Sequence, residues 1–221
     1  MKPMTAVVAD FDRIAAALDA EPGERRLTRA ERFLVRNVPV HARSALDVGC
    51  GDGLLTRALA ARGIATLGID ASPGMIALAR HRTGGNPRID YRVADVMTWV
   101  MPGTFDVVLS VSTAHHVALE EIVPQLVAAV APGGTLLIQD VTTRQGMRGL
   151  PMNAMAWCMR RIGRVTGAPA HSKTVAALYD AHGIDEEYLN ESDVEGVYRT
   201  LLPEARAYLH LDWRYTIVWQ R

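Results

Sequence analysis

The segment Ala45–Gly53, which reads ALDVGCGDG, decides the fold of this chain. Its apolar start ends in an acid, and glycines then occupy every second position, at 49, 51 and 53. A second short apolar run, Ala65–Asp70, also ends in an acid. The pattern predicts a strand, a tight turn of bare backbone, a helix, and a second strand that carries a carboxylate. These are the parts with which an α/β sheet holds an adenosine-containing cofactor.

Strands and helices alternate along the central part of the chain. Apolar runs predict strands at 44–50, 65–70, 89–94, 105–111 and 135–139, and helical spacing predicts helices at 53–62, 72–82 and 119–131. The tail predicts an antiparallel hairpin, because runs at 205–211 and 214–220 are joined by a turn of about two residues. We therefore expect an α/β fold, a doubly wound and mostly parallel seven-stranded sheet with an antiparallel C-terminal hairpin.

Helical segments flank this core on both sides in the sequence. The residues before the first strand show helical spacing, and 142–190 holds helical segments without a convincing strand. We therefore expect a single domain over residues 1–221. Residues 1–40 would form an N-terminal helical cap, and 142–190 would form a helical lid inserted before the hairpin.

The composition predicts a soluble globular protein. Apolar residues make up 49% of the chain, and 24 Lys and Arg balance 24 Asp and Glu. Zero net charge argues against nucleic acid as a partner. We find no signal peptide and no run of about 18 apolar residues that could span a membrane, so we expect a cytoplasmic location. Cys50 and Cys158 indicate neither a disulfide nor a zinc site, and we predict no metal site.

Three acid-bearing elements, in this order, carry a family resemblance. They are Asp47–Gly53, with the spacing D-x-G-x-G-x-G, then Leu67–Ser72, then Ala94–Val96. In these elements the sequence resembles the class I, Rossmann-like S-adenosylmethionine-dependent methyltransferases, and the predicted hairpin is similar to the reversed last strand of that family. The resemblance implies methyl transfer from S-adenosyl-L-methionine to an O, N or C atom of a small molecule, giving S-adenosylhomocysteine.

The resemblance also implies a cofactor site at the ends of these strands. Asp70 would accept hydrogen bonds from the ribose hydroxyls, Asp95 would contact the adenine amino group, and the Val96 backbone N–H would contact a ring nitrogen. Asp47 would approach the methionine portion of the cofactor, or would instead hydrogen-bond the glycine loop. Phe11 lies in a segment similar to an aromatic-Asp-x-Ile helix that folds over the amino-acid end of the cofactor, with core packing as its alternative role. The expected cofactor-binding set is Phe11, Asp47, Gly49, Cys50, Gly51, Gly53, Asp70, Ala71, Asp95, Val96 and Ser110.

The acceptor side is predicted from the residues just beyond the fourth and fifth strands. His115 and His116 follow the fourth strand, where a neutral imidazole could take a proton from the acceptor, or could cap the next helix or pack against the cofactor. Asp140 follows the fifth strand and would orient the substrate or sit at an exposed strand end. Met152 and Met155 share one face of a lid helix, where they would line an apolar substrate wall or belong to the core.

Other functions compete with this interpretation. Dinucleotide-binding folds have the spacing G-x-G-x-x-G, and here Leu54 takes the place of the third glycine, which disfavours an NAD-dependent oxidoreductase. A non-catalytic module that binds the cofactor or a partner on the same fold is a second alternative, because fold does not fix function. A protein methyltransferase is a third. We expect a small-molecule acceptor as the partner, and a monomer or homodimer.

Overall fold

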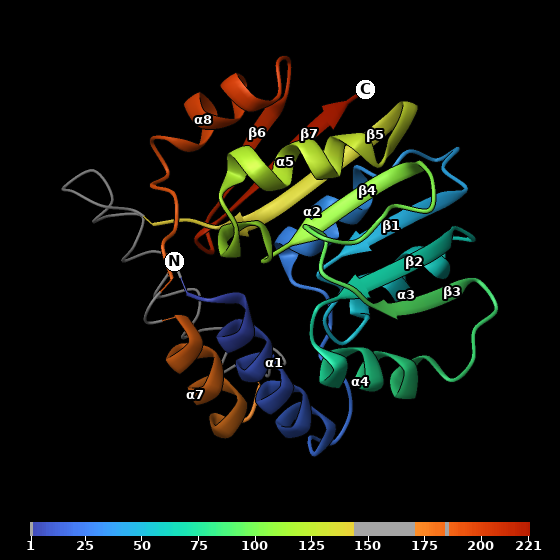
Figure 1. Ribbon diagram of the computed structural model, residues 1–221, viewed down its shortest axis with the longest axis vertical. Coiled ribbons are helices and arrows are strands. Elements are labelled where there is room, and N and C mark those ends of the chain that lie inside the picture. The colour runs from blue at the N-terminus through green and yellow to red at the C-terminus, as the bar shows by residue number, and fades with distance from the viewer. Residues whose placement is uncertain (1, 144–170, 184–185) are drawn as a thin grey trace.

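A seven-stranded sheet forms the centre of the protein (Figure 1). The computed structural model describes residues 2–143, 171–183 and 186–221. The strands are β1 (Ser44–Val48), β2 (Ala65–Asp70), β3 (Ile89–Val93), β4 (Phe105–Val111), β5 (Val130–Val141), β6 (Arg206–His210) and β7 (Arg214–Gln220). Their order is β3-β2-β1-β4-β5-β7-β6, and β7 pairs antiparallel with both β5 and β6 while the other pairs are parallel. The predicted mostly parallel sheet with an antiparallel C-terminal hairpin is confirmed.

Helices cover both faces of this sheet. They are α1 (Met4–Asp19), α2 (Arg29–Arg36), α3 (Leu54–Ala60), α4 (Pro73–Thr83), α5 (Leu119–Ala128), α7 (Lys173–His182) and α8 (Val194–Leu201), with a 3₁₀ turn η1 (Ala114–His116). Figure 1 shows α5 in front of the sheet and α3 behind it. Alternation along β4 explains the two layers, because buried Val108 packs with Leu126 of α5 whereas buried Val107 packs with Leu59 of α3. No helix among the described residues is long and apolar enough to cross a membrane.

Helices α1 and α7 lie side by side, and α4 packs against α1 (Figure 1). Ile14 of α1, Met75 of α4 and Val175 of α7 belong to one buried cluster. A polar contact fixes the same junction, since Asp12 Oδ1 accepts hydrogen bonds from Ser72 Oγ at 2.6 Å and from the Gly74 backbone N–H at 2.9 Å. Helix α1 is thereby held against the first turn of α4. By contrast, α2 packs against the sheet, with Leu34 in the layer behind it.

Two of the differences from the predicted boundaries have a clear physical cause. The strand predicted at 135–139 begins at Val130, because the backbone of Gly133 and Gly134 pairs with that of Arg221 through hydrogen bonds of 3.1 and 3.0 Å. Tertiary pairing here overrides the Pro-Gly-Gly signal that predicted a helix end and a loop. The hairpin loop has residues 211–213 rather than a two-residue turn, and Trp213 takes a positive φ of 56° to close it.

The described residues leave out most of the predicted lid. Met152 and Met155, expected to line the substrate, lie outside them, as does Cys158. Within the range 142–190, α7 is helical as expected. The division into a cap at 1–40 and a lid at 142–190 stays a prediction.

Candidate cofactor and acceptor site

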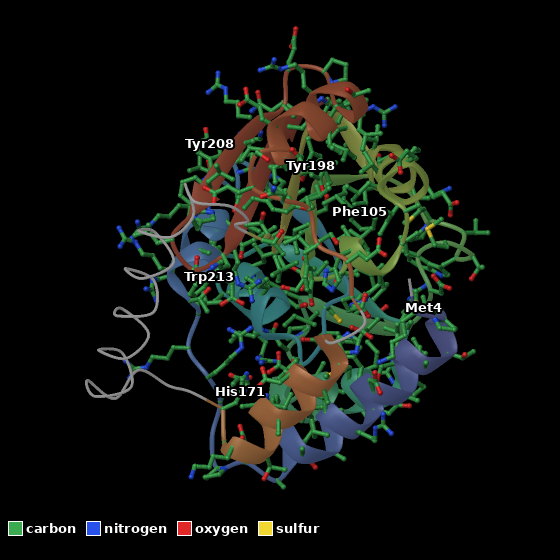
Figure 2. All side chains as sticks on the ribbon, turned by 90° about the vertical axis from the view of Figure 1, so that its left-hand side faces the viewer. Met4, Phe105, His171, Tyr198, Tyr208 and Trp213 are labelled. Carbon is green, nitrogen blue, oxygen red and sulfur yellow. The ribbon has the colours of Figure 1, made fainter. Side chains whose placement is uncertain are left out.

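A cavity of about 600 Å³ opens at the carboxyl ends of β1, β2 and β4. This is the edge at which ligands bind in parallel α/β sheets. Its walls also include residues of α1 and α7, and Figure 2 labels two of them, Met4 at the start of α1 and His171 just before α7. Of the predicted cofactor set, nine residues line it: Phe11, Asp47, Gly49, Cys50, Gly51, Asp70, Ala71, Asp95 and Val96.

The three glycines of the first turn are needed for different reasons. All have positive φ, at 70°, 52° and 78°. A Cβ on Gly49 would lie 2.0 Å from Thr113 Oγ1, and one on Gly53 would lie 2.2 Å from the Tyr91 hydroxyl, so these two glycines allow the protein's own packing. A Cβ on Gly51 would meet nothing within 4 Å. Gly51 therefore leaves bare backbone against open space in the cavity wall, which is where a ligand can lie close to the chain.

Asp70 stands at the end of β2 and holds the turn in place. Its Oδ2 accepts a hydrogen bond from the Gly51 backbone N–H at 2.9 Å, and its Oδ1 accepts one from the Ser72 backbone N–H at 2.8 Å. Burial raises the pKa of this carboxyl. Each carboxylate oxygen can accept a further hydrogen bond, so Asp70 can bind two neighbouring hydroxyls of a ligand while keeping both backbone contacts.

Asp95 and Val96 form the adjoining wall, beyond the end of β3. Asp95 Oδ1 accepts a hydrogen bond from the Met97 backbone N–H at 2.9 Å, which leaves Oδ2 for another donor. The Val96 side chain is buried in the core in front of the sheet. The two residues are therefore fixed before any ligand arrives.

Asp47, for which the sequence allowed either a cofactor contact or an internal hydrogen bond, makes an internal hydrogen bond. It is 1% exposed, and its Oδ2 accepts a hydrogen bond from Thr56 Oγ1 of α3 at 2.6 Å. Burial raises its pKa to about 7, because the charged form is poorly solvated there. The observed side-chain partner of Asp47 is therefore Thr56 of α3, where the sequence suggested the glycine loop. Cys50, three residues after Asp47, is also buried, and burial raises the pKa of its thiol.

Two members of the predicted cofactor set lie outside the cavity lining. Ser110 is fully buried within β4, and its hydroxyl has no hydrogen-bond partner. Gly53 caps the start of α3 and faces Tyr91 and Arg57 instead. Neither Ser110 nor Gly53 therefore lies where the sequence predicted it, at the wall of this cavity.

The end of the cavity beyond β4 contains a histidine held by a carboxylate. His115 Nδ1 lies 2.7 Å from Asp140 Oδ1, and the His115 backbone N–H donates to Asp140 Oδ2 at 3.1 Å. Burial lowers the pKa of His115, but the Asp140 carboxylate more than offsets this and the net pKa is raised. Asp140 is 1% exposed, so the alternative of a solvent-exposed strand end is wrong. It stands behind His115 and is absent from the cavity lining.

His116 is held by packing rather than by hydrogen bonds. Neither ring nitrogen has a hydrogen-bond partner, and burial, then the nearby imidazoles of His115 and His182, lower its pKa to about 3. Phe11 packs edge-on against both His116 and His182, with ring centroids 5.7 and 4.8 Å away. Phe11 therefore forms part of the cavity wall next to His116 and His182.

Comparison with known proteins agrees with this geometry. Residues 46–138 match a family described as a methyltransferase domain. Over 156 residues the chain is 30% identical to a ubiquinone biosynthesis O-methyltransferase of Sinorhizobium medicae, covering 67% of this chain and 58% of the relative. Residues 46–138 therefore form an S-adenosylmethionine-dependent methyltransferase domain. S-adenosylmethionine is the cofactor of this family, as the resemblance in the first three strands predicted.

Other relatives of the chain carry related names. A ubiquinone biosynthesis O-methyltransferase of Methylobacterium nodulans is 33% identical over 165 residues, covering 66% of each chain. A trans-aconitate 2-methyltransferase of Paracidovorax citrulli is 38% identical over 128 residues, covering 55% of this chain and 48% of the relative. The methyltransferase therefore spans about half to two thirds of the length of these curated relatives.

Solved structures share the whole fold. DhpI in complex with S-adenosylhomocysteine superposes with a TM-score of 0.62 at 17% identity, covering 97% of this chain and 94% of that one. The N-methyltransferase NodS of Bradyrhizobium japonicum WM9, also with S-adenosylhomocysteine, has a TM-score of 0.57 at 16% identity and covers 96% and 98%. At these identities the likeness is one of fold.

Sequence reasoning missed several residues at the histidine end of the methyltransferase site. His182, at the end of α7, places Nδ1 3.0 Å from Asp10 Oδ2 of α1. Glu186 places Oε1 3.4 Å from His116 Nδ1. Tyr188 packs at a tilted angle against His115, with the two ring centroids 5.0 Å apart. These three residues are close together in the sequence but far from His115 and His116, so no local spacing in the sequence could have linked the two segments.

Proposed function

We propose that this methyltransferase transfers a methyl group from S-adenosylmethionine to an oxygen of a small-molecule acceptor. The observation that carries the proposal is the continuity of one cavity, which runs from Gly51, Asp70 and Asp95 to His115. The names of the curated relatives, which are O-methyltransferases and a trans-aconitate 2-methyltransferase, support an oxygen acceptor. The open space at Gly51, which a Cβ would fill, fits a cofactor that lies against the backbone.

The contacts proposed at the cofactor end follow from the hydrogen-bonding capacity of Asp70, Asp95 and Val96. Asp70 would accept from the two ribose hydroxyls with the lone pairs that Gly51 and Ser72 leave free. Asp95 Oδ2 would accept from the adenine amino group, and the Val96 backbone N–H would donate to a ring nitrogen. Hydrogen bonds to a charged acceptor contribute about 1.5–3 kcal/mol each, so Asp70 would dominate the affinity.

The acceptor end follows from the pair formed by His115 and Asp140. Asp140 fixes the orientation of the ring by its contact with Nδ1, which leaves Nε2 to accept a proton from an acceptor hydroxyl. The sulfonium of the cofactor supplies an already activated methyl group. Positioning of the acceptor in line with that methyl therefore supplies most of the acceleration, and a general base adds roughly 10²–10⁴-fold.

The test is turnover with a panel of acceptors. The full chain is incubated with S-adenosylmethionine and phenols, catechols, carboxylic acids or amines, and S-adenosylhomocysteine is measured by mass spectrometry. We expect turnover with an oxygen acceptor. His115→Gln should lower kcat by roughly 10²-fold or more without changing the affinity for S-adenosylhomocysteine, whereas His81→Gln, on the exposed face of α4, should change neither.

Three outcomes would contradict the proposal. Binding of S-adenosylhomocysteine without turnover on any acceptor would favour the non-catalytic module. Turnover restricted to amines would exclude an oxygen acceptor. A rise in melting temperature with NAD but none with S-adenosylhomocysteine would favour the oxidoreductase.

A further inference from the structure

Several buried polar atoms at the histidine end of the cavity make no hydrogen bond. Among the described residues, nine buried side-chain nitrogen or oxygen atoms lack a hydrogen bond, and five of these belong to His116, His182 and Glu186. Both oxygens of Glu186 are among them, and its side chain is only 1% exposed. Buried polar groups are nearly always satisfied, and a buried carboxylate without a partner is costly. A cluster of such atoms facing one another therefore points to a cation.

The distances within this cluster suit a metal ion. Glu186 Oε1 lies 3.4 Å from His116 Nδ1 and 3.7 Å from His182 Nε2. Ligands of a tetrahedral ion about 2.0–2.2 Å from each donor stand roughly 3.3–3.6 Å apart, so Glu186 is close to the spacing of a shared ligand with each of the two histidines. His115 borders the same point, since one ligand atom of each of His115, His116 and Glu186 lies within 4.8 Å of the others.

The cluster also has the outer contacts typical of metal sites. His182 Nδ1 lies 3.0 Å from Asp10 Oδ2, which fixes the ring and leaves Nε2 directed to Glu186. Asp10 in turn forms ion pairs with Lys2 and Arg13. Metal-binding histidines usually donate their second ring nitrogen to a carboxylate or carbonyl in this way.

We propose that His116, His182 and Glu186 bind one divalent transition-metal ion, with Zn²⁺ as the best fit, and that His115 stands at its open side. Two imidazoles and one carboxylate suit Zn²⁺ or Co²⁺, whereas Mg²⁺ and Ca²⁺ prefer sites built from oxygen atoms. His115, His116 and His182 line the cavity, so the open position would face the acceptor end of the site. The metal site goes beyond the proposed methyl transfer and does not depend on it.

The test measures metal binding directly, in the absence of cofactor and acceptor. The full chain, without an affinity tag and freed of metal by chelation, is titrated with Zn²⁺ by calorimetry and with Co²⁺ by visible absorption. We expect one equivalent of each to bind, and the Co²⁺ protein to show the intense absorption bands of a four-coordinate site. Glu186→Gln and His182→Gln should each weaken binding at least tenfold, and His81→Gln should leave it unchanged. Asp10→Asn should weaken it about 10–100-fold by freeing the ring of His182.

Two results would overturn the metal site. One is a wild-type chain that binds neither ion. The other is binding that survives in Glu186→Gln, His182→Gln and His116→Gln alike. Affinity for S-adenosylhomocysteine, measured on every variant, shows that each has folded, and its retention in a metal-free variant separates a failure of this site from a failure of the proposed function.

Discussion

Substitution of Gly51 by Ala should separate cofactor binding from folding. A Cβ on Gly51 meets nothing within 4 Å, and the residue lines the cavity. The same methyl on Gly49, two residues earlier, would lie 2.0 Å from Thr113 Oγ1 and 2.8 Å from Thr113 Cβ. The two variants add the same atom to the same turn, so they form a matched pair.

The magnitudes follow from the backbone and the space. Both glycines have positive φ, 52° at Gly51 and 70° at Gly49, so an alanine at either position costs about 1–2 kcal/mol in backbone strain. Gly49→Ala adds overpacking of roughly 1–3 kcal/mol because Thr113 is short and cannot swing away. In Gly51→Ala the overpacking of about 1–3 kcal/mol falls on the bound cofactor, which corresponds to a five- to 150-fold loss of affinity.

The assay pairs urea unfolding with calorimetric titration of S-adenosylhomocysteine. We expect Gly51→Ala to lose only the stability of about 1–2 kcal/mol that backbone strain costs, and to bind the ligand much more weakly. Gly49→Ala should lose more stability than Gly51→Ala, by the additional overpacking of roughly 1–3 kcal/mol. The reasoning is refuted if Gly51→Ala binds with wild-type affinity, or if Gly49→Ala is as stable as Gly51→Ala.

Three further results are expected. Burial raises the pKa of Asp47 from 3.8 to about 7, so between these pH values the folded state holds a proton that the unfolded state has lost. The free energy of unfolding should therefore fall as the pH rises from about 4 to about 7, by at most ~4 kcal/mol relative to Asp47→Asn in parallel urea titrations. An identical pH dependence in both proteins would contradict this. Ser110→Ala should leave the affinity for S-adenosylhomocysteine unchanged and cost no stability, since the buried hydroxyl has no partner; a tenfold weaker affinity would place Ser110 back at the cofactor. Thr28→Ala should lower the stability by about 1 kcal/mol in urea unfolding, because Thr28 and Glu31 form a capping box at the start of α2, and an unchanged midpoint would argue against it.

The sheet could be predicted because its signals are local. Each of the first four strands is an apolar run bounded by turn residues, and the structure places them within about two residues of the predicted limits. The start of β5 could not be predicted in this way, because Gly133 and Gly134 are extended by pairing with Arg221 at the far end of the chain. Only the folded chain brings these residues together.

The candidate site was likewise predictable where residues follow a strand, and unpredictable where distant segments meet. Asp70 and Asp95 follow strands directly, so the sequence predicted their place at the edge of the sheet, and both line the cavity. Ser110 shows the limit of that argument, because alternation along β4 turns its side chain into the core. His182 and Glu186 reach His116 only because α7 docks on α1, and no motif marks that contact.

The most direct test of the account is the affinity of Asp70→Ala for S-adenosylhomocysteine, measured by calorimetry. Asp90→Ala serves as its control, because Asp90 lies on the neighbouring strand β3 with an exposed side chain that pairs with Arg92. We predict that Asp70→Ala binds at least about thirtyfold more weakly, a loss of roughly 2 kcal/mol, while Asp90→Ala binds as the wild type does. Near-native affinity in folded Asp70→Ala would contradict the account.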